Sequence, residues 1–393
     1  MNKSLNLFAT AVLLLLFTSA SAQVHDIETV LKTIDANNLE IKASRATVES
    51  KKAEAKAQRN LANPEVSFSA MKAPDAPKSH EFSVMQQFDF PTHYVALNKM
   101  AKYQNNLAER THAVCRRTIL LQTKMLCLEL IANQQKSQCL QLQRATIDKL
   151  GEFYASAFEK GDVDAITMSR IDVTKIAIQG ALQQLEQTDI DLHAALQDLN
   201  AGVGVAFASA AYPLVSLPTD TASLFEQNVL EHPAMLQAQV KAQVAQQQVR
   251  TERSAALPQF GVGYKQSYDG IQTHRGLQLS VSIPIFAHRS RVKMASAEAD
   301  AEAINLQLQN AMLRTQFQQQ WQRAESLQRT LANMPVETLH NALRQLKLTL
   351  DERQITLQQY LQETTTIFET LQQRISLEHE YHKAIAILTQ NEL

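Results

Sequence analysis

The 393-residue chain carries 38 Lys and Arg against 39 Asp and Glu, a nearly neutral balance that gives no indication of a nucleic-acid partner. Its 9 Gly and 10 Pro fall far below the roughly 28 and 20 expected from average usage, which excludes turn-rich sandwiches, propellers and doubly wound α/β enzymes. Ala, Leu and Gln are abundant, and this composition favours long helices.

Residues 1–22 have the pattern of a signal peptide. Lys3 precedes an apolar stretch from Leu7 to Phe17, and Ala20-Ser21-Ala22 forms a small-residue cleavage site. The next residue is Gln23 rather than Cys, so we expect an exported chain that is not a lipoprotein. No later apolar run reaches the roughly 18 residues that a transmembrane helix requires.

The mature chain is interpreted as a tandem duplication of a unit of about 190 residues. Corresponding positions recur at a nearly constant offset: Arg59 and Arg253, Pro64 and Pro258, Phe90-Pro91 and Ile283-Pro284. We predict a first repeat over 23–200, a linker over 201–221 that contains two Gly and two Pro, and a second repeat over 222–393.

Each repeat reads helix, strand, strand, long helix, helix. In the first repeat, a helix over 27–61 precedes alternating segments at about 65–72 and 81–90, which predict strands. A long helix over 92–156, which would extend about 95 Å, and a shorter helix over 164–200 follow. The second repeat predicts strands at about 259–268 and 276–285, a long helix over 287–350 and a helix over 355–391. Pro335 should kink or break the long helix.

Strands of about 9–11 residues with one apolar and one polar face are typical of transmembrane β-barrels. In the second repeat the apolar face consists of Phe260, Val262, Leu277, Leu279 and Val281, which we assign to contact with lipid. Two soluble hairpins packed on helices would show the same alternation, and the strands alone favour this alternative. No nearby strand or turn-rich segment offers a soluble core, however, and this favours the barrel. Four strands cannot close a barrel in lipid, so a barrel would require an oligomer, and a trimer would supply twelve strands.

No pattern indicates catalysis, a cofactor or a bound metal. None of the 9 Gly begins a nucleotide-binding motif. Cys115, Cys127 and Cys139 lie about 18 Å apart along one predicted helix, so they are interpreted as small buried hydrophobic residues. His379 and His382 lack the spacing of a zinc protease and an evident third ligand, and we interpret them as part of a solvated helix face.

The ordered set of features resembles the outer-membrane efflux proteins, the TolC-like channel-tunnels. The resemblance rests on the duplication, the strand pair before each long helix, the strand-to-helix steps at Phe90-Pro91 and Ile283-Pro284, and the aromatic-x-x-Gly turn from Phe158 to Gly161. It covers essentially the whole mature chain, and the compact length is similar to that of the metal-efflux branch.

The resemblance implies a mainly α protein with a minor β part and no enzymatic activity. A homotrimer would form a twelve-stranded barrel in the outer membrane of a Gram-negative bacterium, continuing into a periplasmic α-barrel. The implied function is a passive, water-filled exit duct for small molecules or ions, in contact with the lipid bilayer. Its implied partners are a periplasmic adaptor and an inner-membrane pump of the resistance-nodulation-division type. The alternative is a periplasmic coiled-coil scaffold or adaptor without a channel.

The resemblance also assigns residues at the periplasmic tip. Adaptor contact is expected at Phe158, Gly161, Val163, Leu350, Arg353 and Ile355. A lumen constriction is expected among Asp162, Asp164, Gln359, Gln362 and Glu363. Some family members carry acidic residues where this chain has Gln359 and Gln362, so a strongly anionic gate is not expected here.

Overall fold

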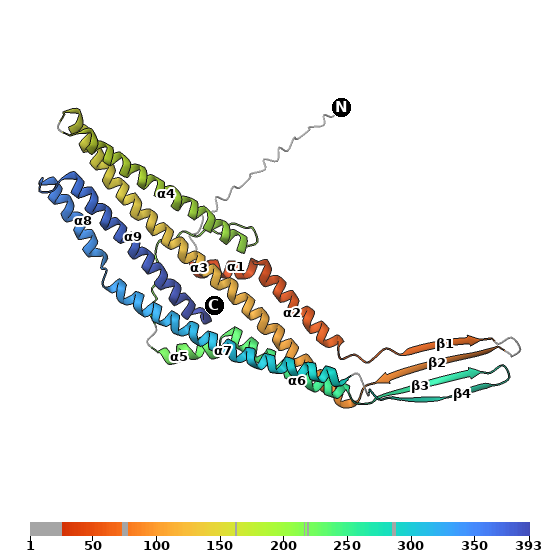
Figure 1. The fold of residues 1–393 in the computed structure, drawn as a ribbon. Helices are drawn as coiled ribbons and strands as arrows, with labels where there is room; N and C mark the ends of the chain where they lie inside the picture. Colours follow the sequence, from red (N-terminus) through yellow and green to blue (C-terminus); the bar gives the residue numbers. More distant parts are fainter. Residues whose placement is uncertain (1–25, 73–77, 162, 216, 218–219, 285–287) are drawn as a thin grey trace, which may run out of the picture.

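A computed structural model describes residues 26–72, 78–161, 163–215, 217, 220–284 and 288–393. Helices form one end of an elongated molecule, and a single sheet projects from the other end (Figure 1). The predicted signal peptide and the candidate constriction residue Asp162 lie outside the described residues.

The first predicted helix is two helices in the structure, α1 (Ile27–Asn37) and α2 (Leu39–Ala57). Asn38 between them has an extended ψ of 127°, and its side-chain oxygen accepts a hydrogen bond from the Ile41 N–H at 2.9 Å. Its side-chain amide donates to the Leu199 carbonyl at 2.8 Å. The sequence predicted a continuous helix because it holds no Gly or Pro, but a capping Asn with a distant partner ends α1 there.

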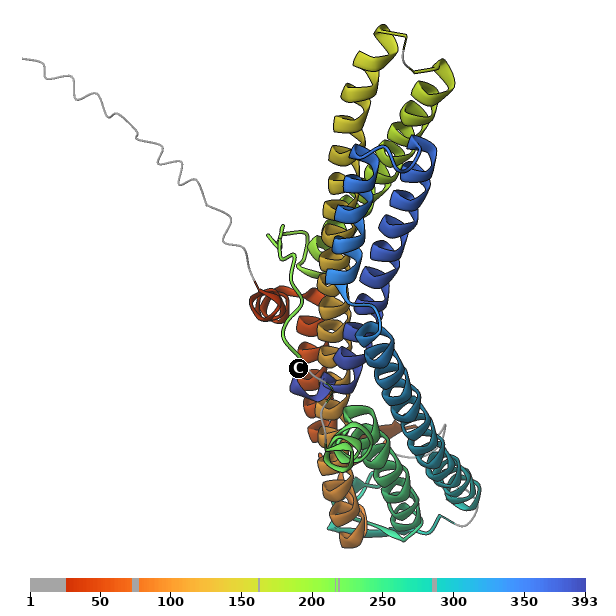
Figure 2. The same ribbon diagram turned by 90° about the vertical axis from the view of Figure 1, so that its left-hand side faces the viewer.

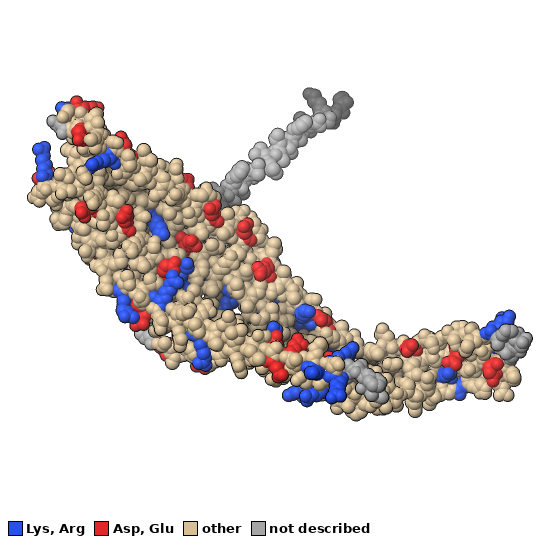
Figure 3. Space-filling view, in the orientation of Figure 1, with Lys and Arg blue, Asp and Glu red and all other residues tan. Residues whose placement is uncertain are grey.

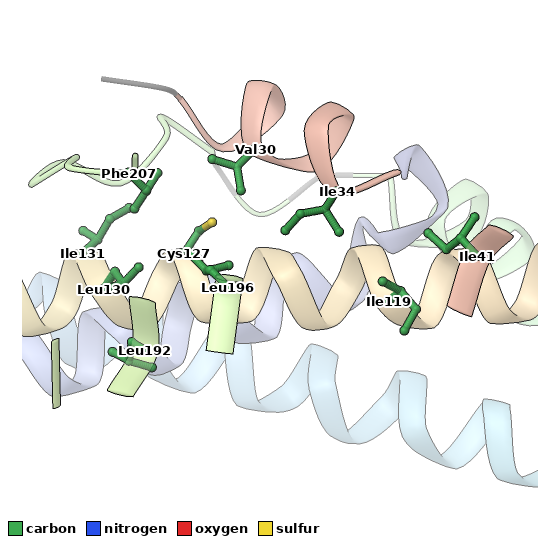
Figure 4. Packing of buried hydrophobic residues seen from close by; sticks show 10 residues of the cluster. All are labelled: Val30, Ile34, Ile41, Ile119, Cys127, Leu130, Ile131, Leu192, Leu196 and Phe207. Carbon is green, nitrogen blue, oxygen red and sulfur yellow. The ribbon is translucent and has the colours of Figure 1, made fainter. Parts of the chain in front are cut away.

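The longest element is α3 (Pro91–Glu159), whose 69 residues extend about 100 Å. Pro91 occupies its first turn, where a missing N–H removes no helical hydrogen bond. α4 (Ala165–Leu199) returns antiparallel to it. In Figure 4, Cys127 and Ile131 of α3 point into a cluster with Val30 of α1 and Leu196 of α4, which fixes the first repeat's helices together.

The second repeat contains α6 (Pro233–Ala255), α7 (His288–Ala332), α8 (Val336–Asp351) and α9 (Leu357–Leu388). Short elements flank them: α5 (Thr221–Phe225), a π-helical turn at Glu226–Leu230 and a 3₁₀ turn at Gln390–Glu392. The long helix predicted over 287–350 is interrupted at Pro335, which has φ −65° and ψ 128° and precedes α8. Proline lacks the N–H that would continue the α7 ladder, so the expected break occurs here.

Four strands form one antiparallel sheet in the order β1 (Glu65–Met71), β2 (Ser79–Phe88), β3 (Gln259–Tyr268), β4 (Thr273–Ser282). The β2–β3 pairing joins the two repeats. β4 begins three residues before its predicted start because Asp269 forms a tight turn, accepting from the Ile271 and Gln272 N–H groups at 2.8 Å. The sheet extends beyond the helices instead of packing on them (Figure 1), so the alternative of two hairpins packed on helices is wrong.

The three cysteines differ in burial. Cys127 is fully buried, whereas Cys115 and Cys139 are half-buried, and all three are free thiols. Burial raises the pKa of Cys127 to about 12 and that of Cys139 to about 11, so both are protonated at neutral pH. The interpretation as buried hydrophobic residues therefore holds fully only for Cys127.

Candidate functional site

The register of the sheet collects the apolar strand residues on one face. Phe260 lies opposite Val281, and Val262 lies opposite Leu279. Leu277, on the same face, is 85% exposed, and Leu279 is 77% exposed. All five residues assigned to lipid contact thus share one face, which no described segment of the protomer covers.

Aromatic rings lie at both ends of this apolar face. At the helical end, the rings of Phe90 and Phe260 have centroids 6.2 Å apart. At the outer end, His80 lies between Phe68 and Tyr268, with centroid distances of 6.4 and 5.0 Å. Barrel proteins carry aromatic residues at the two edges of their lipid-facing band.

Lys and Arg side chains gather where the helices meet the sheet (Figure 3), and α7 begins there with a basic segment.

The opposite face of the sheet is polar. The Ser67 and Ser83 hydroxyls lie 2.8 Å apart across β1 and β2. A Cβ added at Gly263 would lie 2.5 Å from the Val84 carbonyl oxygen and 3.2 Å from the Met85 sulfur. Position 263 therefore requires glycine, because β3 of the second repeat lies too close to Val84 and Met85 of β2 for a side chain.

Two turns form the end of the molecule opposite the sheet. Gly161 has φ +79° and Arg353 has φ +59°, and each donates its backbone N–H to a carbonyl three residues earlier at 2.9 Å. The acceptors are Phe158 and Leu350, so both turns have the same geometry. The α3–α4 turn reaches farther from the sheet than the α8–α9 turn (Figures 1 and 2). The six predicted tip residues all lie in or beside these turns: Phe158, Gly161, Val163, Leu350, Arg353 and Ile355.

Two candidate constriction residues cap helices. Asp164 accepts from the Thr167 N–H at 2.8 Å at the start of α4, and hydrogen bonds from Thr167 lower the pKa of this carboxyl. Gln359 accepts from the Thr356 N–H at 2.9 Å, and the Thr356 hydroxyl accepts in return from the Gln359 N–H. Thr356 was not predicted as a cap, although it aligns with Asp164 in the repeat.

Gln362 lies at a groove between α4 and α9. This groove has a volume of about 660 Å³, and Ile166, Val173 and Leu361 give it an apolar lining that Gln362 borders. Glu363 is exposed and does not line this groove. The structure thus brings Gln362, but not Gln359, to a surface concavity near the tip.

The two histidines of α9 are packed, and their interpretation as a solvated face is wrong. Tyr212 of the linker stacks on His382 with a centroid distance of 4.2 Å, and its hydroxyl lies 3.5 Å from His379 Nδ1. Burial lowers the pKa of His382 to about 4, so its ring is neutral at pH 7. Within the described residues, no three His, Cys, Asp or Glu side chains are placed to hold a metal ion together.

Among the described helices, none combines the length and apolar character needed to cross a membrane. No protein-family model and no curated protein sequence matches the chain.

The fold, by contrast, is similar to solved channel structures. CusC is 13% identical over 94% of this chain and 92% of its own, with a TM-score of 0.77. The CmeC outer-membrane channel of Campylobacter jejuni is 14% identical over 93% and 85%, with a TM-score of 0.77. The MtrE outer-membrane channel of Neisseria gonorrhoeae, in its open state, is 11% identical over 93% and 88%, with a TM-score of 0.76.

At these identities the likeness concerns the fold. The chain has the TolC-like fold of outer-membrane efflux channels: mainly helical, with long antiparallel helices and one four-stranded antiparallel sheet. The predicted protomer fold, mainly α with a minor β part, is confirmed, whereas the trimeric barrel stays a prediction. Assignment to the metal-efflux branch stays a prediction.

Proposed function

We propose that the chain is the protomer of a trimeric outer-membrane channel that serves as a passive, water-filled exit duct for small molecules or ions. The two-faced sheet carries this proposal. Its apolar face is exposed, bordered by aromatic rings and uncovered by any described segment, which suits contact with lipid. Its polar face suits a water-filled lumen.

Trimer formation has support from two surfaces. β1 and β4 are the edges of the sheet, and pairing β4 of one copy with β1 of the next would close a twelve-stranded barrel without edges in lipid. Ile304, Leu308 and Met312 of α7 are exposed at four-residue spacing, which places them along one side of the helix. Such a stripe suits burial against a neighbouring copy in a periplasmic α-barrel.

The geometry of the tip supports the proposed partners. The two turns and the apolar groove lie at the end farthest from the sheet, where a periplasmic adaptor could reach them from the inner membrane. The duct itself performs no chemistry, so transport energy would come from an inner-membrane pump, of the resistance-nodulation-division type by resemblance.

The barrel assignment is tested by charge placement on the two faces of β4. Leu279→Arg should impair trimer assembly in the outer membrane, since a charge at mid-bilayer costs about 2–4 kcal/mol. Gln278→Arg, one residue away on the polar face, is the matched control and should assemble normally. Assembly is measured by trimer resistance to dissociation in detergent. Equal effects of the two substitutions would reject the barrel.

Membrane fractionation distinguishes the proposed channel from the alternative, a periplasmic scaffold without a channel. We expect the protein to stay in outer membranes after high-salt and carbonate washes. Release by these washes would support the scaffold.

Adaptor docking at the tip is tested separately at Gly161. No atom lies within 4 Å of a Cβ added there, and Arg adopts the same left-handed region at position 353. Gly161→Arg should therefore leave trimers intact while it abolishes export, measured as loss of substrate efflux from cells. Failure of trimers to form would show that the glycine is only structural and would contradict the docking role.

A further inference from the structure

The polar face of the sheet carries few charged residues, and two of them form a pair. Its strand positions with an ionisable side chain are Glu65, Glu81, Lys265 and His274. Glu65 lies at the helical end of β1, and His274 lies at the outer end, 3.2 Å from Asp269. Only Glu81 and Lys265 lie between these ends.

Glu81 and Lys265 come from different repeats and meet across β2 and β3. The register places Lys265 opposite Ser83 and Glu81 opposite Ser267, so the two charged residues are diagonal neighbours. Lys265 Nζ lies 2.8 Å from Glu81 Oε1, and the side chains are 43% and 36% exposed. The residues opposite them on the neighbouring strands are Ser69, Ser83, Ser267 and Gly276, which are too small to cover the pair.

Sheet stability gives little reason for this pair. An exposed cross-strand ion pair contributes about 0.2–1 kcal/mol, and two neutral polar residues would serve a polar face equally well. The charges matter more to a solute, because fixed charges of one sign along a narrow passage enrich ions of the opposite sign.

We infer that Glu81 and Lys265 are selectivity-determining residues that balance the charge of the strand-lined part of the duct. This inference rests on the proposed trimeric channel. Threefold symmetry would place three such pairs at one level around the lumen, where each carboxylate is compensated by an ammonium group. Removal of one partner leaves three like charges, whose field extends about 10 Å at 0.1 M salt and about 30 Å at 0.01 M.

The test is ion selectivity of full-length trimers in planar lipid bilayers, measured as the reversal potential in a gradient of dilute KCl. Glu81→Gln should raise the permeability of chloride relative to potassium, and Lys265→Gln should lower it, each by about twofold. The double variant Glu81→Gln/Lys265→Gln and the exchanged pair Glu81→Lys/Lys265→Glu should both behave as the unaltered protein does.

The outcomes separate this inference from the proposed function. If the unaltered protein forms no pores, the channel itself is rejected, and the inference with it. If pores form but the single variants shift selectivity in the same direction, or do not shift it, the charge-balance role is overturned while the channel stands. The exchanged pair guards against misfolding, because restored selectivity with reversed charges requires a correctly assembled sheet.

Discussion

At the tip, Gly161 of the first repeat and Arg353 of the second have left-handed backbones, with φ +79° and +59°. Both turns are followed by a capped helix, with Asp164 as the cap of α4 and Thr356 as the cap of α9. The two turns thus have the same backbone path although their residues differ. The repeats diverge elsewhere: α3 is continuous, whereas its counterpart is broken at Pro335. The duplication preserves turn geometry more strictly than helix continuity or residue identity.

The largest expected effect lies where the hairpins of the two repeats meet. Gly263→Ala would place a Cβ 2.5 Å from the Val84 carbonyl, so the backbone must move, at a cost of about 3 kcal/mol. Gly276→Ala on the same face, where a Cβ meets nothing within 4 Å, is the control. Thermal dissociation of the assembled protein measures both. Equal stability of the two variants would show that the hairpins tolerate each other without glycine.

The helix break of the second repeat should depend on Arg374. Its Nε donates to the Met334 carbonyl at 2.9 Å, and its Nη1 donates to Glu378 at 2.8 Å. Arg374→Gln should destabilise the protein by about 2 kcal/mol, because a partly buried, charge-assisted bond is lost. Arg144 lies in the uninterrupted helix α3 and is more exposed. Arg144→Gln should therefore have a smaller effect on the midpoint of chemical denaturation.

Two equivalent helix caps should respond differently to acid. Asn38 caps α2, and His232 at the aligned position caps α6 through Nδ1, which accepts from the Ala234 N–H at 3.1 Å. Burial and the nearby Arg117 lower the pKa of His232 to about 4. Folding favours the neutral ring. The stability that this cap contributes to the folded protein is therefore complete above about pH 6.5 and is lost as the pH falls through about 4.

Hydrogen exchange measures this difference between the repeats. Protection of the first turn of α6 should decrease between pH 7 and pH 4, whereas protection of the first turn of α2 should not, with a cap contributing about 1 kcal/mol. His232→Asn should make α6 behave as α2 does. A decrease that persists in this variant would assign the acid response to another group.

Exchange of the tip residues should have the smallest effect on stability. Gly161→Arg and Arg353→Gly should each change the free energy of unfolding by only about 1 kcal/mol, since the left-handed region costs an ordinary residue about 1–2 kcal/mol. Denaturant midpoints of the two variants provide the measurement. A loss as large as that of Gly263→Ala would mean that the two turns are not interchangeable.

Local patterns in the sequence predicted the strands, the tip turns and the break at Pro335, because each depends on residues close together in the chain. Contacts between distant segments could not be predicted. The break at Asn38 involves the Leu199 carbonyl, 161 residues away, and the packing of His379 involves Tyr212, 167 residues away. Gln359 was assigned to a constriction by resemblance, whereas in the structure its side chain forms a capping box with Thr356, which the alignment of Thr356 with Asp164 could have indicated.

The open edges of the sheet have a consequence for assembly of the proposed trimer. Until β1 and β4 pair with another copy, a single protomer presents unpaired backbone groups beside an uncovered apolar surface. Such edges readily pair with the wrong strands and lead to aggregation. In the proposed trimer, pairing of β4 with β1 of the next copy would remove these edges, so insertion of the sheet into a membrane should coincide with the joining of copies.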